Sequence, residues 1–245
     1  MPPIDTLTFD LDDTLWDNHQ VMVKTETGHY AWLDEALTAW LSPPSETPRA
    51  GFTERFPLES FVARRQQLAR AHPLRRGDFT WIRQRALTEL LMEYGLGQDD
   101  ASHWAARAME RFMALRHQVE PYAEVDALLT ALAGRYRLAS ITNGNVDIAR
   151  LPIAAHFRVS IAAGEMLAPK PDARPFLAAL ARLGSRPSRA LHVGDSWRED
   201  VLPAQRLGMQ VAWIDIHDKG AARLPPGVHR LRHVSELPAL LARLD

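Results

Sequence analysis

A short apolar stretch near the N-terminus is followed directly by acidic residues. Residues 4–9 have the composition of a buried strand, and Asp10, Leu11 and Asp12 follow directly. Because side chains alternate along a strand, we expect Asp10 and Asp12 on the same side. Two carboxylates this close repel each other unless a cation or a shared proton offsets their charge. The pattern is typical of a nucleophilic carboxylate paired with an acid/base carboxylate beside a metal ion. A polar strand end or a helix N-cap is the alternative.

Beyond Pro121 the chain alternates between helical and strand patterns. Strands are expected over residues 137–142, 157–162, 190–193 and 210–214, and helices over residues 125–133, 172–183, 201–207 and 237–244. Gly184 is the expected stop of the second of these helices. This alternation predicts an α/β fold with a parallel sheet covered on both faces. Ligands of such sheets bind beyond the carboxyl ends of the strands, where Asp10, Thr142 and Asp195 are expected to converge.

The region between residues 18 and 118 has a different character. Amphipathic helical stretches cover residues 21–41, 58–71, 79–94 and 101–117, and no convincing strand pattern appears among them. We therefore expect two domains. Residues 1–17 and 119–245 form the α/β core, and residues 18–118 form an all-helical insertion.

Composition narrows the classes of function. A net charge of −1 over 245 residues gives no electrostatic case for binding nucleic acid or a membrane surface. Without cysteine the chain forms neither disulfides nor thiolate metal sites. The N-terminus lacks a basic region followed by an apolar core, and no uncharged apolar run approaches membrane-spanning length. The simplest interpretation is a cytoplasmic protein, a monomer or weak dimer, that acts on a small molecule.

Three later segments also combine an apolar run with polar residues. They are Ile141-Thr142-Asn143-Gly144-Asn145, Ala168-Pro169-Lys170-Pro171-Asp172 and Leu191-His192-Val193-Gly194-Asp195-Ser196-Trp197-Arg198-Glu199-Asp200. Together with the acidic run near the N-terminus, these segments resemble the four motifs of the haloacid dehalogenase (HAD) superfamily, in order and at plausible spacing. The resemblance implies a Rossmann-like core with a helical cap inserted after the first strand.

The resemblance also implies roles for the motif residues. Asp10 would be the nucleophile that forms a phosphoaspartate, and Asp12 would protonate the leaving oxygen and then deprotonate the hydrolytic water. Thr142 and the backbone amide of Asn143 would hold phosphoryl oxygens. Lys170 would offset negative charge on both Asp10 and the phosphoryl group.

A magnesium ion is the cofactor that the resemblance implies. Mg²⁺ prefers hard oxygen ligands, and the family pattern assigns it the side chains of Asp10 and Asp195 and the backbone carbonyl of Asp12. Asp200 would orient a metal-bound water. The alternative for Asp200 is a stabilising position at a helix N-terminus.

Asp12 separates the subfamilies of this superfamily. Its dehalogenases and phosphonatases lack an acid at this position, whereas the mutases of glucose phosphate share it. The mutase motif continues with glycine where this chain has Asp13, which favours hydrolysis over transfer. A phosphotransferase or phosphomutase stays open as an alternative. So does a catalytically silent binding protein, although that class would be marked by loss of Asp10, Asp12 or Asp195.

The helical insertion is expected to select the substrate. It is rich in tryptophan and arginine, and Trp81 and Arg83 are candidates for substrate contacts. The alternative is a set of core aromatics with a solvated basic face. The motif sequences further resemble a bacterial branch of phosphatases that hydrolyse flavin mononucleotide and the phosphorylated ribitylaminouracil of riboflavin biosynthesis. This resemblance implies a sugar- or polyol-phosphate substrate with a link to riboflavin metabolism.

Overall fold

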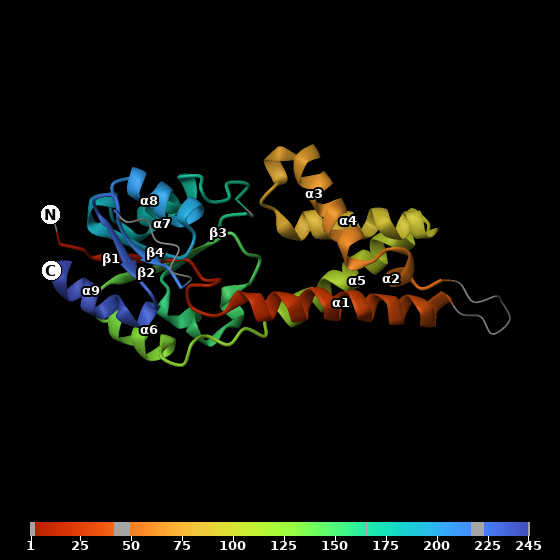
Figure 1. Cartoon of the computed structure of the whole chain (residues 1–245), viewed down its shortest axis with the longest axis horizontal. Coiled ribbons are helices and arrows are strands. Elements are labelled where there is room, and N and C mark those ends of the chain that lie inside the picture. Colours follow the sequence, from red (N-terminus) through yellow and green to blue (C-terminus); the bar gives the residue numbers. More distant parts are fainter. Residues whose placement is uncertain (1–2, 42–49, 165, 217–222, 245) are drawn as a thin grey trace. The chain divides into compact units, whose positions relative to one another are not determined.

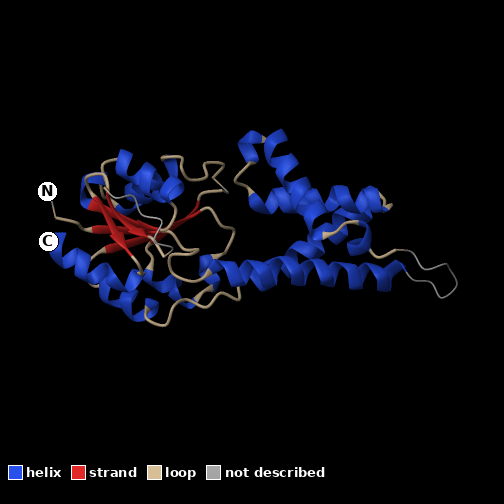
Figure 2. Cartoon of the chain, in the orientation of Figure 1, coloured by secondary structure: helices blue, strands red, loops and turns tan. Residues whose placement is uncertain are grey.

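The computed structural model describes residues 3–41, 50–164, 166–216 and 223–244. Within them lies a parallel sheet of six strands in the order β3-β2-β1-β4-β5-β6 (Figure 2). The strands are β1 (Thr6–Phe9), β2 (Arg137–Thr142), β3 (Val159–Ala162), β4 (Ala190–Gly194), β5 (Gln210–Ile214) and β6 (Val228–Leu231). The predicted α/β class with a parallel sheet is confirmed.

Helices cover both faces of this sheet. α7 (Arg174–Leu183) and α8 (Leu202–Arg206) lie over one face, and α6 (Val125–Ala133) and α9 (Leu237–Leu244) lie over the other (Figure 1). β1 is buried along its whole length, as expected for a central parallel strand covered on both sides. α7 ends at Gly184, whose left-handed φ of 62° suits a residue without a side chain and confirms the predicted stop.

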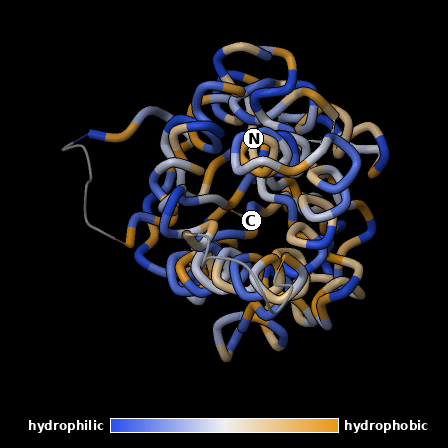
Figure 3. The backbone as a smooth tube through the Cα atoms, turned by 90° about the vertical axis from the view of Figure 1, so that its right-hand side faces the viewer, coloured by the Kyte–Doolittle hydropathy of each residue, from blue (hydrophilic) through white to orange (hydrophobic). Residues whose placement is uncertain are grey.

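The chain divides into two compact units, one of Met1–Asn18 with Glu120–Asp245 and the other of His19–Val119. The helices of the second unit are α1 (Asn18–Leu41), α2 (Phe52–Arg55), α3 (Leu58–Ala71), α4 (Phe79–Tyr94) and α5 (Gln98–Arg116). Hydrophilic and hydrophobic residues are interspersed along the chain (Figure 3), and the apolar sides of these helices share a core that includes Leu33, Phe61 and Phe112. The described residues of this unit contain no strand, and no described helix of the chain is long and apolar enough to span a membrane.

The strand β6 and the turn before α8 differ from the sequence-based prediction, and the short helix α2 was not predicted either. The edge strand β6 was not predicted, because buried Val228 and Leu231 enclose half-buried His229 and Arg230, which is neither an apolar run nor a strict alternation. The helix expected from residue 201 is preceded by one turn of π-helix over Trp197–Val201. This wider turn lies directly beyond β4 and contains Asp200.

Candidate active site

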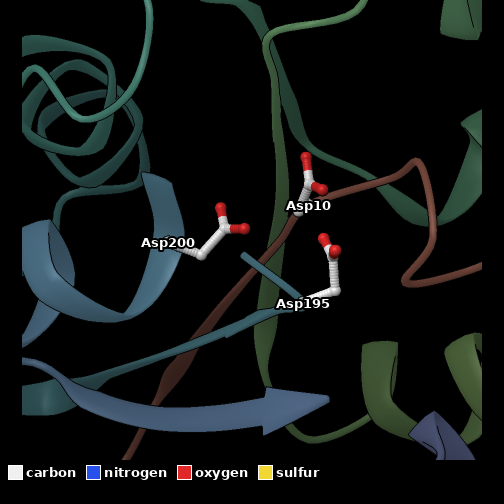
Figure 4. Close-up of side chains that lie close together, drawn as sticks. All are labelled: Asp10, Asp195 and Asp200. Atoms are coloured by element: carbon white, nitrogen blue, oxygen red, sulfur yellow. The ribbon is translucent and has the colours of Figure 1, made fainter. Parts of the chain in front are cut away.

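Three carboxylates meet at the carboxyl edge of the sheet. Asp10 follows β1, Asp195 follows β4, and Asp200 lies in the π-helical turn beyond it. Figure 4 shows their carboxyl groups converging, and one oxygen from each lies within 4.8 Å of the others. The N–H of Asp10 donates to the carbonyl of Val193 at 2.8 Å. The pairing of β1 with β4 therefore places two acids side by side that are far apart in the sequence.

The ammonium group of Lys170 joins two of these carboxylates. Its Nζ donates to Asp10 Oδ1 at 2.7 Å and to Asp200 Oδ1 at 2.6 Å. Lys170 is only 3 % exposed, so both charge-assisted hydrogen bonds lie in a medium of low dielectric. The lysine between two prolines thus reaches the same edge of the sheet as the acids.

The side chain of Asn143 holds the backbone of Lys170. Asn143 Oδ1 accepts from the Lys170 N–H at 2.7 Å, and Asn143 Nδ2 donates to the Lys170 carbonyl at 3.0 Å. Nδ2 also donates to Glu199 Oε2 at 2.8 Å. Asn143 therefore fixes the loop that carries the lysine, in addition to the backbone role that the sequence predicts for it.

Thr142 is the last residue of β2, and Asp12 lies shortly after the end of the neighbouring strand β1. Thr142 is buried, and its Oγ1 accepts from the N–H of Gly144 at 2.9 Å, so the hydroxyl proton is directed elsewhere. Asp12 is half-buried, and its Oδ1 accepts from Trp16 Nε1 at 2.9 Å. The indole fixes the Asp12 carboxyl group two residues beyond Asp10.

Asp200 is fully buried and uses both of its oxygens. Oδ1 accepts from Lys170 and lies 3.1 Å from His192 Nε2, and Oδ2 accepts from the N–H of Ser196 at 3.0 Å. Gly194 allows this close approach, because a Cβ at that position would lie 2.5 Å from Asp200 Cγ. Asp200 is therefore placed to hold Lys170.

Gly194→Ala is expected to lower the free energy of unfolding by about 1–3 kcal/mol, because the added Cβ would lie 2.5 Å from Cγ of Asp200, which is fully buried and held by hydrogen bonds from Lys170 and Ser196. Urea unfolding measures this loss. The control is Gly97→Ala, where the backbone has an ordinary φ of −65° and nothing lies within 4 Å of an added Cβ. That control is expected to change stability by less than about 0.5 kcal/mol. Equal losses for the two variants would contradict the packing argument.

A profile of the haloacid dehalogenase-like hydrolase family matches residues 4–208. The chain belongs to this family. The match covers the helical insertion and extends on both sides of it into the sheet-containing unit, as far as the end of α8, and the predicted membership of the HAD superfamily is confirmed.

Curated relatives of this HAD hydrolase are phosphatases. The 5-amino-6-(5-phospho-D-ribitylamino)uracil phosphatase YigB of Escherichia coli is 31 % identical over 211 residues, which are 86 % of this chain and 83 % of that protein. The phosphoserine phosphatase of Thermus thermophilus is 34 % identical over 140 residues, 55 % of each chain. The prediction that the chain is an enzyme, a hydrolase of this superfamily, is confirmed.

A solved structure described as a 2-haloacid dehalogenase from Pseudomonas syringae pv. Tomato DC3000 superposes with a TM-score of 0.84. It is 34 % identical to this chain, and the superposition covers 99 % of this chain and 100 % of that one. The structure of a HAD phosphatase from Thermococcus onnurineus gives a TM-score of 0.65 at 21 % identity, covering 97 % and 98 % of the two chains, and this likeness shows the fold alone.

Negative charge exceeds positive charge in the acidic cluster of this HAD hydrolase. Burial raises the pKa of Asp10 well above its ordinary value, and Lys170 only partly opposes this because Asp200 and Asp195 add repulsion. Burial and the charge of Asp200 raise the pKa of Asp195 to about 7. Burial would raise the pKa of Asp200 too, but the ammonium of Lys170 lowers it to about 2. Three carboxylates thus share one ammonium.

The residues present fit a divalent cation. With all three acids ionised, the cluster with Lys170 carries two excess negative charges in a buried site, which one divalent cation would balance. The available donors are carboxylate oxygens, which are the ligands that Mg²⁺ prefers. Because the oxygens of Asp200 already accept from protein donors, Asp10 and Asp195 are the better direct ligands.

The two candidate substrate residues of the insertion lie within the helical unit. Arg83 Nη1 is 2.6 Å from Glu26 Oε1, and its guanidinium lies over the ring of Phe112 at 4.3 Å. Trp81 is partly buried against the helical core, with its ring 4.9 Å from that of His72. Both contacts stabilise the helical unit, and a contact of either residue with substrate stays a prediction.

His192 and Glu199 were missed by the sequence analysis. Both lie inside the fourth motif segment, and each contacts a predicted site residue, Asp200 and Asn143 respectively. A histidine in the middle of an otherwise apolar strand is the one sequence signal that points to His192. Glu199 carries no such signal, because an acid in the first turn of a helix is common.

Proposed function

We propose that the chain is a Mg²⁺-dependent phosphomonoester hydrolase that acts through a phosphoaspartate on Asp10. The observation that carries the proposal is the buried Asp10 carboxylate, held by Lys170 beside two further acids at the carboxyl edge of the sheet. The phosphatase relatives support the same reaction class. We also propose that the helical unit acts as a cap, and a cytoplasmic location and a monomer or weak dimer stay predictions.

In the first half-reaction a carboxylate oxygen of Asp10 attacks phosphorus, and the bond from phosphorus to the ester oxygen breaks. Asp12 donates a proton to the leaving oxygen, so the alcohol departs neutral. The Thr142 hydroxyl and the Asn143 amide are proposed to bind the phosphoryl oxygens. Lys170 offsets the charge that accumulates between nucleophile and phosphoryl group.

In the second half-reaction water attacks the phosphorus of phosphoaspartate, and Asp12 accepts the proton of that water. Inorganic phosphate leaves and the Asp10 carboxylate is regenerated. Asp10 and Asp195, with the backbone carbonyl of Asp12, would hold the metal ion, and Asp200 would orient one of its waters. A bound Mg²⁺ supplies positive charge that lets an anionic nucleophile approach an anionic phosphate.

Asp195→Asn is expected to stabilise the metal-free protein at pH 8 by on the order of 2 kcal/mol. The folded-state pKa of Asp195 is about 7, above its ordinary value of 3.8. As pH rises from about 4 to 7, the unfolded chain has lost this proton while the folded chain keeps it, so the free energy of unfolding falls. Above pH 7 the loss of stability caused by ionised Asp195 is complete. Asparagine avoids this loss because its side chain carries no charge.

Urea unfolding at pH 5 and pH 8, with chelator or with Mg²⁺, measures this effect. Wild type is expected to gain stability from Mg²⁺ by ligand linkage, whereas Asp195→Asn gains little. The control Asp99→Asn removes an exposed carboxylate from the first turn of α5 and keeps the Mg²⁺ response. An equal Mg²⁺ response in wild type and Asp195→Asn would remove Asp195 from the metal ligands.

The proposed substrate is a small sugar- or polyol-phosphate, with a flavin-related compound as the leading candidate. The support is the similarity to YigB over most of both chains. Trp81 and Arg83 are the cap residues that we propose for substrate contacts. Because the solved dehalogenase structure is also similar, cleavage of a carbon–halogen bond is the competing activity. Asp12 favours the phosphate ester, since an alkoxide leaving group needs a proton and a halide does not.

A panel of substrates tests the proposed function. Phosphate release is measured from flavin mononucleotide, sugar phosphates and nucleotides, and halide release from 2-chloropropionate, each with Mg²⁺ and with chelator. Mg²⁺-dependent phosphate release is expected, with no halide release. Halide release without phosphate release would replace the proposal by dehalogenation. Phosphate release from other substrates but not from flavin-pathway compounds would remove only the proposed flavin-related substrate.

A further inference from the structure

A chain of hydrogen bonds runs from the interior of the sheet into the acidic cluster. Thr8 on β1 and His192 on β4 are register partners, and Thr8 Oγ1 lies 2.8 Å from His192 Nδ1. His192 Nε2 lies 3.1 Å from Asp200 Oδ1, the oxygen that also accepts from Lys170. The imidazole is fully buried, and its ring packs against the edge of Phe176 at 4.9 Å. Both nitrogens of a buried ring thus point at partners.

These partners determine which nitrogen carries the proton. Because Oδ1 accepts from the ammonium group of Lys170 and Oδ2 accepts from the N–H of Ser196, the Asp200 carboxylate acts as an acceptor at both oxygens. His192 Nε2 must therefore donate to it. In a neutral ring Nδ1 then accepts, and the hydroxyl of Thr8 is its donor. Burial lowers the pKa of His192, which agrees with a neutral ring.

We propose that His192 is a positioning residue for the phosphatase reaction, which fixes the Asp200 carboxylate so that Lys170 is held against the nucleophile Asp10. The proposal rests on the proposed function, since it concerns the same site. No substrate or metal contact is assigned to His192, because it acts through Asp200.

The geometry explains why such an anchor is needed. A lysine side chain is a flexible stem with a point charge, so its position depends on the groups that receive it. The Ser196 N–H fixes Oδ2 of Asp200, and His192 fixes Oδ1, which together set the plane of the carboxylate. Without the His192 donor, Lys170 would be the remaining donor to Oδ1 among the described residues, and the position of the carboxylate would follow that of the ammonium group.

His192→Phe keeps a ring in the cavity and removes both hydrogen bonds. With p-nitrophenyl phosphate and Mg²⁺, kcat is expected to fall about 10–100-fold, as for other groups that orient catalytic residues indirectly. KM is expected to change less than about threefold, because binding of the ground state is not altered. His192→Gln retains a donor of similar reach and is expected to recover most of kcat. Thr8→Val removes only the hydrogen bond between Thr8 and His192, and it is expected to lower kcat less than His192→Phe does.

A double-mutant cycle with Asp200→Asn separates positioning from general damage to the fold. If His192 acts through Asp200, adding His192→Phe to Asp200→Asn lowers kcat by less than about threefold. The packing control is Phe176→Leu, which is expected to lower stability with kcat unchanged. The inference would be overturned if His192→Phe left kcat unchanged. It would also be overturned if His192→Phe lowered kcat by the same factor in the Asp200→Asn background as in wild type. Wild type that releases no phosphate from any substrate would instead overturn the proposed function, and the inference with it.

Discussion

Asp10→Asn is expected to lower kcat for phosphate release by at least about 10³-fold while the protein stays folded. The amide has the shape of the carboxylate but cannot attack phosphorus. Lys170 keeps its second partner Asp200 at 2.6 Å, so the loop that carries the lysine stays in place. Removing one of the three clustered negative charges also relieves repulsion in the metal-free cluster. Phosphate release at saturating substrate, with a thermal unfolding curve for each protein, measures both parts of the prediction.

Asp5→Asn is the matched control, because Asp5 precedes β1 and lies at its opposite end. Its carboxylate pairs with Arg137 and Arg189, both at 2.7 Å, so its loss is expected to lower stability and leave kcat unchanged. Acid quenching with labelled substrate adds a direct test: wild type retains covalent phosphate and Asp10→Asn does not. Retention of more than about a tenth of the wild-type kcat in Asp10→Asn would remove Asp10 as the nucleophile.

Asp12→Asn is expected to slow the first half-reaction for substrates with a poor leaving group much more than for substrates with a good one. For an alkyl phosphate such as a sugar phosphate, kcat is expected to fall about 10²–10⁴-fold, because the leaving oxygen receives no proton. p-Nitrophenyl phosphate needs no such proton, so its first half-reaction should proceed. The phosphoaspartate then persists, because no base activates the attacking water. A burst of one nitrophenol per protein, followed by slow turnover, is the expected result in stopped-flow measurements.

Asp13→Asn is the control for the neighbouring acid. Asp13 has a left-handed φ of 57°, which asparagine also tolerates, and its Oδ1 accepts from the N–H of Asn18 at 2.9 Å. An asparagine oxygen can accept the same bond, so turnover of both substrates should stay near wild type. Equal losses of kcat for alkyl and aryl phosphates in Asp12→Asn, without a burst, would contradict the acid/base assignment.

Much of the fold could be predicted because its signals are local. The run that ends at Asp10, the glycine stop at Gly184 and the helical periodicity of residues 58–71 are each visible within a few residues of sequence. Parallel strands share one carboxyl edge, so the convergence of Asp10, Thr142 and Asp195 followed from the alternation of strands and helices. β6 was missed because its four residues mix buried and half-buried side chains.

The partners of the buried polar groups were decided only by the tertiary structure. His192 meets Thr8 because β1 and β4 pair in that register, and a shift by one residue would turn the imidazole to the other face of the sheet. Glu199 reaches Asn143 because the wide turn after β4 passes beside the end of β2. The sequence by itself determined which acids and which lysine arrive at the edge of the sheet, since strand ends are encoded locally. Which hydrogen bonds orient them there depends on register and packing between distant segments, and those exist only once the chain has folded.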